Sequence, residues 1–355
     1  MKYSRARLDS IGYELAPVVV TSSELEQRLA PVYERLHLSA GQLESLTGIK
    51  ERRWWGRDQT LVDGASAAAE KALNQAGLEA SDIEILIYTG VCRELFEPAT
   101  ACAVADRLKL RADSQIYDLS NACLGMLNGI IDVANRIELG QIRAGLIVSC
   151  ESAREINDLM IEEMLENQGM QHFTLSLATL TGGSGAAAIC ITDGSFNHTD
   201  SPQLVGAVAR ARPEHHGLCR WGMFSDTEQS ANENTHAAHR QRMQTDSTSV
   251  LKHGVQLGKE TWEHFLSHLN WHPESIDRVI CHQVGSGHQD QILRAFGINP
   301  DKDFSSYTHL GNMGTVSLPL TAALANQREF LKHGQRVAFL GIGSGLNCMM
   351  LGWQW

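Results

Sequence analysis

Cys123 is the residue in this sequence best placed to act as a nucleophile. It follows an apolar segment, residues 115–119, that is predicted to be a strand, and it begins a predicted helix over 123–139. A thiol at the amino end of a helix lies at the positive end of the helix dipole, which stabilises the thiolate. The segment is not a hydrolase nucleophile elbow, because Asn121 rather than glycine stands two residues before the thiol. On spacing alone, the plainer interpretation is that Cys123 is a small buried side chain that packs at the start of the helix.

His282 and Asn312 stand at similar junctions later in the chain. His282 directly follows the apolar strand predicted over 278–281, at the edge where α/β sheets present functional groups. Asn312 lies in a glycine-flanked turn, residues 311–314, before another predicted helix. Each alone would more often be structural. A thiol, an imidazole and a carboxamide that all stand at such junctions are a sharper signal of a functional site.

Alternating apolar strands and helices must position these three side chains. Continuous apolar strands separated by helices predict a parallel sheet that is covered on both faces. A capping box at Thr21–Glu24 opens the first helix, which we expect to run to about Leu36. The other predicted helices cover residues 65–76, 99–108, 249–269, a segment ending at 296, and 318–331, and further predicted strands cover 83–89, 144–150 and 336–340.

Two glycine-rich runs of similar sequence suggest a duplicated architecture. Residues 182–190 close the first half of the chain, and residues 343–350 close the second. Two similar βα halves are the simplest explanation of this internal similarity. We therefore predict an N-terminal half over 1–195 that carries the cysteine, and a C-terminal half over 196–355 that carries the histidine and asparagine.

Composition and charge exclude several classes of function. The net charge of −11 argues against nucleic-acid binding, which needs a basic face. The amino terminus has no apolar signal region, and no segment approaches 18 uninterrupted apolar residues, so we expect no membrane partner. The eight cysteines form no C-x-x-C pair, and several lie in apolar runs, as in a reducing compartment. We expect a soluble cytoplasmic protein.

The polar segment 213–247 is predicted to be an excursion on the surface. His236 and His239 within it could share a metal ion, but no carboxylate or cysteine completes a ligand set. We therefore predict no metal site.

Over nearly its whole length the sequence resembles the ketoacyl-ACP synthase III branch of the thiolase superfamily. The resemblance rests on the segment 118–125 around Cys123, on His282-Gln283, on Gly311–Gly314, and on the run Gly341-Ile-Gly-Ser-Gly345. It implies a homodimer with a five-layered α-β-α-β-α fold built from two duplicated βα halves. It also implies a 3-oxoacyl-ACP synthase that needs no cofactor beyond its substrates, acyl-CoA and malonyl-ACP.

The resemblance also implies a role for each site residue. Cys123 would accept the acyl group, and His282 and Asn312 would hold the malonyl thioester carbonyl while CO₂ leaves. The backbone N–H groups of Cys123 and Gly345 would form the oxyanion hole. Such hydrogen-bond donors suit a decarboxylative Claisen condensation, because loss of CO₂ leaves an enolate without a strong base. The sequence is similar to that of the medium-chain-primed members of the family, which act in fatty acid biosynthesis.

Glu97 departs from the usual synthase pattern. It stands where many synthases carry an aromatic side chain that reaches into the partner subunit's site. In the related olefin-pathway enzymes, which join two acyl-CoAs, a glutamate at this place acts as a base across the dimer interface. A carboxylate at the rim before a proline turn is the other interpretation, and both stay open.

The expected contacts to CoA and to the acyl carrier protein also depart from the family. The tryptophan and arginine that sandwich adenine in well-known synthases are not retained. Arg52, Arg53 and Trp54 lie nearby and could replace them, although a strand end with a solvated basic edge is the plainer interpretation. The arginine that docks the carrier protein is Gly287 here, while Arg294 offers a basic position further along.

Three rivals to the decarboxylative condensation therefore remain. The first is a head-to-head condensation of two acyl-CoAs without loss of CO₂. The second is acyl transfer from Cys123 to an oxygen or nitrogen nucleophile. The third is a scaffold subunit with an inert site.

Overall fold

The fold is a single mixed β-sheet with helices on its faces. The computed structural model describes residues 1–355 except 168, 197–199 and 226–238. Nine strands run in the order β11-β12-β13-β8-β1-β7-β6-β4-β5. Their bounds are β1 (Arg7–Leu15), β4 (Ile85–Tyr88), β5 (Gln115–Asp118), β6 (Ala144–Glu151), β7 (Gly185–Thr192), β8 (Gln203–Ala211), β11 (Arg278–Cys281), β12 (Arg336–Gly343) and β13 (Asn347–Gln354).

The described helices include counterparts of all the predicted ones. They are α1 (Ser22–Arg28), α2 (Ala30–Arg35), α3 (Gln42–Thr47), α4 (Leu61–Ala76), α5 (Thr100–Leu108), α6 (Gly125–Glu138), α7 (Arg154–Glu166), α8 (Met170–Ser176), α9 (Ser247–Leu269), α10 (Ser286–Phe296), α11 (Tyr307–Leu310) and α12 (Ser317–Gln327). Of these, α3, α7, α8 and α11 were not predicted. The capping box at Thr21 is present. The single helix expected to reach Leu36 is wrong, because Pro31 lacks an N–H group and starts a new helix.

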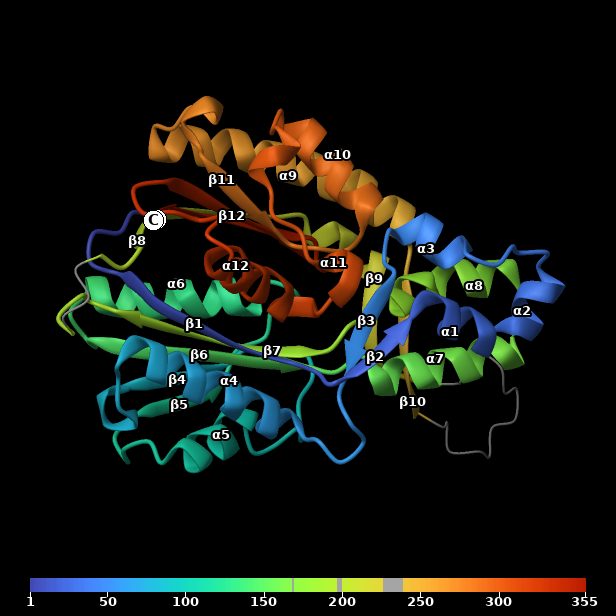
Figure 1. Cartoon of the computed structure of the whole chain (residues 1–355), viewed down its shortest axis with the longest axis horizontal. Coiled ribbons are helices and arrows are strands. Elements are labelled where there is room, and N and C mark those ends of the chain that lie inside the picture. Colours follow the sequence, from blue (N-terminus) through green and yellow to red (C-terminus); the bar gives the residue numbers. More distant parts are fainter. Residues whose placement is uncertain (168, 197–199, 226–238) are drawn as a thin grey trace.

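The elements stack in five layers (Figure 1). Helices α4 and α5 cover one outer face, α9 and α10 cover the other, and α6 and α12 lie between the two halves of the sheet. The two halves of the sheet meet where β1 lies beside β8, at the pair Arg7 and Gln203 and through backbone bonds such as Leu204 N to Ala6 O. The five-layered α-β-α-β-α fold is therefore confirmed.

The sheet is mixed, so the expectation of a parallel sheet was wrong. Among the strand pairs that the structure describes, only β4–β5, β4–β6 and β11–β12 are parallel. Burial on both faces makes a strand continuously apolar whatever the direction of its neighbours. The chain between β12 and β13 is moreover too short for a crossover, so these strands must be antiparallel.

The two halves of the sheet share one topology. In the first half β7 lies between β1 and β6, and in the second β13 lies between β8 and β12. The two glycine-rich runs of the sequence lead into β7 and β13, which are equivalent strands. The predicted division between residues 195 and 196 falls between β7 and β8 and stays a prediction.

Helix α6 packs directly against the end of β12. A Cβ atom at Gly341 would lie 2.5 Å from Leu127 Cδ1 and 2.6 Å from Leu124 Cδ2, which leaves room only for glycine. Both leucines belong to the apolar core that α6 and α12 form between the halves of the sheet. This packing fixes the start of α6, just after Cys123, relative to the second glycine run.

The segment 213–247 is not a simple excursion on the surface. Its described residues form a short 3₁₀ turn and a hairpin of β9 (Cys219–Ser225) and β10 (His239–Thr245), which lies beside α7 and α8 (Figure 1). The polar composition concealed the alternation of Cys219, Trp221 and Met223, which is typical of a half-buried strand. His236 lies outside the described residues, and His239 is exposed.

A separate antiparallel sheet of β2 (Val18–Thr21) and β3 (Glu51–Trp54) completes the described strands. Within the described ranges, no helix is both long enough and apolar enough to cross a membrane.

Candidate active site

One cavity brings together the three side chains that the sequence singled out. Cys123, His282 and Asn312 all line a cavity of about 670 Å³, which is within the usual size of a ligand site. The rest of its wall is mainly apolar and comes from both halves of the chain. The three groups can therefore face one bound molecule.

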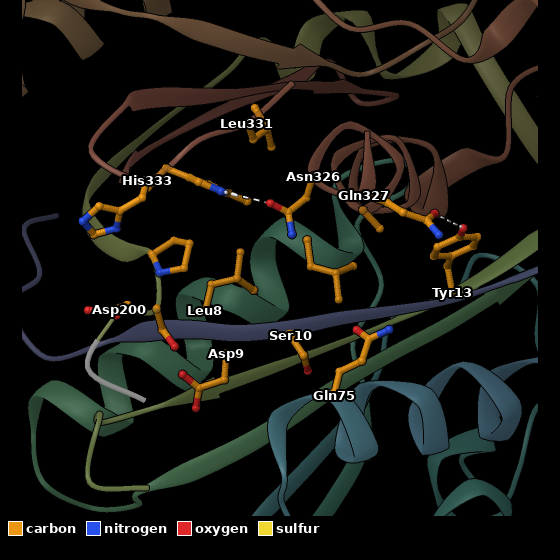
Figure 2. A pocket seen from close by; sticks show the side chains of 15 residues that line it. Leu8, Asp9, Ser10, Tyr13, Gln75, Asp200, Asn326, Gln327, Leu331 and His333 are labelled. Atoms are coloured by element: carbon orange, nitrogen blue, oxygen red, sulfur yellow. Dashed lines mark hydrogen bonds between the residues drawn. The ribbon is translucent and has the colours of Figure 1, made fainter. Parts of the chain in front are cut away.

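A second cavity of about 700 Å³ lies at the seam between the halves (Figure 2). Its wall includes Tyr13, whose hydroxyl donates to Gln327 Oε1 at 2.8 Å. None of the three chemically promising residues lines this cavity. The smaller, more apolar cavity is therefore the candidate active site.

Cys123 lies in a tight turn just before α6. The preceding Ala122 has a φ of 45°, and the first turn of α6 is tied to the second half by Met126 N, which donates to Thr315 Oγ1 at 2.8 Å. Burial, followed by the charges of Cys219 and Glu151, raises the pKa of the Cys123 thiol to about 12. The predicted thiolate is therefore not the resting form, because desolvation outweighs the helix dipole.

His282 is a neutral imidazole at the end of β11. Only 5% of it is exposed, and burial, together with the nearby His288, lowers its pKa to about 3. Its backbone N–H donates to Leu340 O at 2.8 Å, which fixes its position beside β12. Its Nδ1 atom is buried and has no hydrogen-bond partner among the described residues. Because His282 lines the cavity, its ring can exchange a hydrogen bond or a proton with a bound molecule.

Asn312 presents an amide donor to the cavity. Its Oδ1 accepts a hydrogen bond from Gly314 N at 3.1 Å, and a backbone N–H can only donate, so the other end of the carboxamide is the NH₂ group. Its own N–H donates to Thr181 O, and its carbonyl accepts from Gly183 N, both at 2.9 Å. The first glycine run thus holds the turn that carries Asn312.

The second glycine run lies against the Cys123 turn. A Cβ atom at Gly343 would lie 3.4 Å from Cys123 N, and Ser344 and Leu346 line the cavity on either side of Gly345. Asn347 Nδ2 donates to Asn121 Oδ1 at 3.1 Å, which joins the two segments. The backbone groups expected to form an oxyanion hole therefore come from adjoining segments.

Several cavity residues were missed by the sequence analysis. His288 lines the cavity, and burial lowers its pKa to about 4. Glu151 is a buried carboxyl group that accepts from Val91 N at 3.0 Å and Cys92 N at 3.1 Å, and burial raises its pKa. The hairpin contributes Cys219, Arg220, Trp221, Met243 and Thr245. The alternation of apolar residues along β9 was the one sequence signal that could have identified the hairpin residues. Nothing local marks His288 or Glu151.

Two of the predicted CoA contacts are structural instead. Arg52 is fully buried, and its guanidinium donates to Ser22 Oγ and Leu180 O, both at 3.0 Å. Trp54 is buried as well, and its Nε1 donates to Gly182 O at 3.3 Å. Neither side chain is therefore free to bind a phosphate or an adenine.

The remaining predicted contacts lie outside the cavity. Arg53 is half-buried on β3, and Arg294 is exposed on α10. Gly287 does line the cavity, at an exposed position, where it offers no side chain to a docking partner. Among the described residues, no group of three or more His, Cys, Asp or Glu side chains could hold a metal ion.

Glu97 does not line the cavity of its own chain. It is exposed and follows Leu95 and Phe96, which are 58% and 95% exposed. Exposed apolar side chains at this position are compatible with a surface that another protein covers.

Comparison with known proteins identifies the family. A family model for the C-terminal part of 3-oxoacyl-[acyl-carrier-protein (ACP)] synthase III matches residues 266–355. An acyl-CoA:acyl-CoA alkyltransferase from Shewanella oneidensis is 55% identical and covers 100% of both chains. A protein of the same name from Xanthomonas campestris is 33% identical over 99% of this chain and 98% of its own. A beta-ketoacyl-[acyl-carrier-protein] synthase III from Natranaerobius thermophilus is 26% identical over 97% of each chain.

Solved structures agree. Xanthomonas campestris OleA with bound lauric acid and lauroyl-CoA superposes with a TM-score of 0.91 at 33% identity, covering 99% of this chain and 100% of the other. With such identity over its full length, this acyltransferase-type enzyme belongs to the acyl-CoA:acyl-CoA alkyltransferase family, within the ketoacyl synthase III-like branch of the thiolase superfamily.

Proposed function

We propose that this protein joins two acyl-CoA molecules head to head by a non-decarboxylative Claisen condensation. The observation that carries the proposal is the likeness, over the full chain and at 55% and 33% identity, to acyl-CoA:acyl-CoA alkyltransferases. A relative named as a carrier-protein-dependent synthase matches at 26%. The decarboxylative condensation with malonyl-ACP that the sequence favoured is therefore less well supported than the head-to-head condensation.

The first step loads one acyl group onto Cys123. The Cys123 sulfur attacks the thioester carbonyl carbon of acyl-CoA, the bond from that carbon to the CoA sulfur breaks, and CoA leaves as a thiol. The attacking thiol must lose its proton during this step, because its pKa of about 12 keeps it protonated at rest. His282 is neutral and lines the same cavity as Cys123, so its ring is a candidate acceptor of that proton.

The second step forms the carbon–carbon bond. A base removes a proton from the α-carbon of a second acyl-CoA, and the enolate carbon attacks the acyl group on Cys123. The bond from carbon to the Cys123 sulfur then breaks, which releases a 2-alkyl-3-oxoacyl-CoA and restores the thiol. Amide and imidazole donors from Asn312 and His282 would stabilise the enolate oxygen, and Cys123 N and Gly345 N would stabilise the second oxyanion.

Glu97 is the base that we assign to this reaction, supplied by a second copy of the chain. A condensation without loss of CO₂ must remove a proton from carbon, so it needs a base that a malonyl-dependent synthase does not. Glu97 cannot act in its own chain's cavity as described, because it is exposed outside it. The exposed Leu95 and Phe96 beside it would be buried on dimerisation.

The reaction is tested with octanoyl-CoA as the only substrate. We expect a 2-hexyl-3-oxodecanoyl thioester and one free CoA per condensation, without any CO₂ from that step. Cys123→Ala should form neither product nor acyl-enzyme. Product that appears only when malonyl-ACP is added, together with an equivalent of CO₂, would instead establish the decarboxylative synthase.

Mixed dimers test the role of Glu97. Cys123→Ala and Glu97→Gln chains carrying different tags are co-expressed, and the dimer that bears both tags is purified. Both parent homodimers should be inactive, whereas the mixed dimer should regain up to half of the wild-type activity, because one of its sites has both groups. An inactive mixed dimer would contradict action across the interface, and an active Glu97→Gln homodimer would show that Glu97 is dispensable.

A further inference from the structure

Glu151 is a buried carboxyl group on the wall of the active-site cavity that the proposed reaction does not use. It is the last residue of β6, is 4% exposed and lines the cavity together with Cys123. Both of its carboxyl oxygens accept hydrogen bonds from backbone N–H groups. Burial of a carboxyl group costs free energy unless such bonds offset it. The segments that Glu151 binds therefore indicate what it does.

The first segment that Glu151 holds leads directly to Glu97. Glu151 Oε1 accepts from Val91 N at 3.0 Å, and its Oε2 accepts from Cys92 N at 3.1 Å. Residues 93–98, which include Glu97, follow this anchor and are all exposed. The position of this exposed segment, and of the carboxyl group that it carries, therefore depends on Glu151.

The exposed segment is fixed at both of its ends. At its start, the carbonyl of Cys92 also accepts from Tyr88 Oη at 2.7 Å, which ties the anchor to the end of β4. At its other end, the Asp118 carboxylate accepts from Thr100 N at 3.0 Å and from Ala101 N at 2.9 Å. The ends of three neighbouring strands, β4, β5 and β6, thus hold the segment, and its exposed part lies between these fixed points.

The second segment that Glu151 holds carries Asn312. Glu151 also accepts a hydrogen bond from the backbone N–H of Thr315. A Cβ atom at Gly314 would lie 3.1 Å from Glu151 Oε1, so the carboxyl group lies directly against this turn. Gly314 N in turn donates to Asn312 Oδ1 at 3.1 Å, which orients the carboxamide. Glu151 therefore supports the turn that presents the Asn312 amide donor to the cavity.

We propose that Glu151 is a positioning residue that serves two active sites of a dimer at once. Through the turn at Gly314 it sets the direction of the Asn312 donor in the site of its own chain. Through the backbone that precedes the exposed segment it sets the position of Glu97, which removes the α-proton in the site of the other chain. This inference rests on the proposed action of Glu97 across the interface.

Mixed dimers test the role toward Glu97. One chain carries Cys123→Ala and the other Glu97→Gln, so the complete site takes its thiol from the second chain and its base from the first. Glu151→Gln is added to the Cys123→Ala chain, where it replaces one acceptor oxygen by an NH₂ group that faces a backbone N–H. Condensation of octanoyl-CoA should fall about tenfold, because a misplaced reacting group loses its alignment. Single-turnover acylation of Cys123 should stay unchanged.

The opposite placement tests the role toward Asn312. When Glu151→Gln is added to the Glu97→Gln chain, the segment that delivers the base is intact, and the turn that carries Asn312 in the complete site is altered. Condensation should again fall about tenfold, because the donor to the enolate oxygen is misdirected. An unchanged condensation rate in either placement overturns the proposal. A loss confined to this second dimer is the result expected if Glu151 were itself a base in its own site.

Glu84→Gln is the matched control. Glu84 precedes β4, and its Oε2 accepts from Arg143 N and Ala144 N at the end of β4 and β6 away from the cavity. This change should leave both rates unaltered in either chain. Thermal unfolding checks the fold of each dimer, and Glu151→Asp, which keeps the carboxyl group on a shorter side chain, replaces Glu151→Gln if that variant does not assemble. Equal falls in acylation and condensation in the first placement would indicate general damage and reject the positioning role.

The mixed dimer without any change at Glu151 separates this inference from the proposed function. If that dimer is inactive, Glu97 does not act across the interface, and the role of Glu151 is rejected with it. If the dimer is active and Glu151→Gln has no effect, the head-to-head condensation stands and only the role of Glu151 is rejected.

Discussion

Asn347 reaches across the two halves of the molecule to the turn that carries the nucleophile. Its Nδ2 donates to Asn121 Oδ1 at 3.1 Å, and Asn121 in turn donates to Asn128 Oδ1 at 2.7 Å. Neither Asn347 nor Asn121 lines the cavity. The relationship links β13, which follows the second glycine run, to the residue two positions before Cys123. The reactive thiol is thus oriented by a side chain from the other half.

Replacement of Asn347 by alanine should therefore slow acylation of Cys123 without removing any group that touches substrate. We expect a loss of about 1–2 kcal/mol in unfolding free energy and a clear fall in single-turnover acylation rate. Rapid-quench loading with octanoyl-CoA and denaturant unfolding measure the two effects. The control is Gln354→Ala, which removes an exposed hydrogen bond to Gly334 O at the far end of the same strand. Equal acylation rates in both variants would contradict a positioning role.

The pH dependence of acylation should show no inflection from a histidine with an ordinary pKa. Burial lowers the pKa of His282 to about 3, so the ring stays neutral from pH 8 down to about pH 5. A base with the ordinary pKa of about 6.5 would lose most of its activity over that range. We expect the acylation rate to show no such inflection between pH 7.5 and 5.5. Single-turnover rates in buffers of constant ionic strength check this, and a tenfold fall centred near pH 6.5 would refute it.

Gly341→Ala should destabilise the protein because it overpacks the contact between β12 and α6. The new Cβ would lie 2.5 Å from Leu127 Cδ1, so backbone or side chains must shift, at a cost of about 1–3 kcal/mol. Acylation should fall as well, because the displaced helix begins just after Cys123. The control is Gly217→Ala, where nothing lies within 4 Å of the new Cβ. Chemical denaturation of both variants gives the comparison, and equal stabilities would show that the contact is loose.

Asp303 should make the protein more stable in mild acid than in neutral solution. Burial raises its pKa from 3.8 to about 6, so the folded state binds a proton more tightly than the unfolded state. The stability from this proton is complete below about pH 4 and is lost as the pH rises through 6, by up to about 3 kcal/mol. Asp303→Asn cannot show this dependence.

The difference in unfolding free energy between wild type and Asp303→Asn should therefore shift in favour of wild type from pH 7 to pH 4. Urea denaturation at each pH measures it. Protonation of His282 and His288 also affects stability in acid, but both proteins share it, so it cancels in the difference. A difference that stays constant with pH would mean that the carboxyl group titrates normally.

Much of the architecture followed from local patterns. The strand before Cys123, the strand before His282 and the helices that cover them were predicted within a few residues, because apolar periodicity and capping chemistry act over short distances. Patterns of this kind could not reveal strand direction, since burial on both faces looks the same in parallel and antiparallel strands. They also missed the hairpin that carries Trp221, whose outer face is polar.

The sequence by itself determined which groups could do chemistry and where each would lie on its own element. Only the tertiary structure decided the protonation state of each group and whether it is free to bind a ligand. Burial turned Arg52 from a candidate phosphate ligand into a structural cation, and it kept Cys123 a thiol although it stands before a helix. Packing placed His288, Glu151 and Trp221 around the same cavity. Desolvation and proximity depend on residues far apart in the chain, so no local pattern of residues carries them.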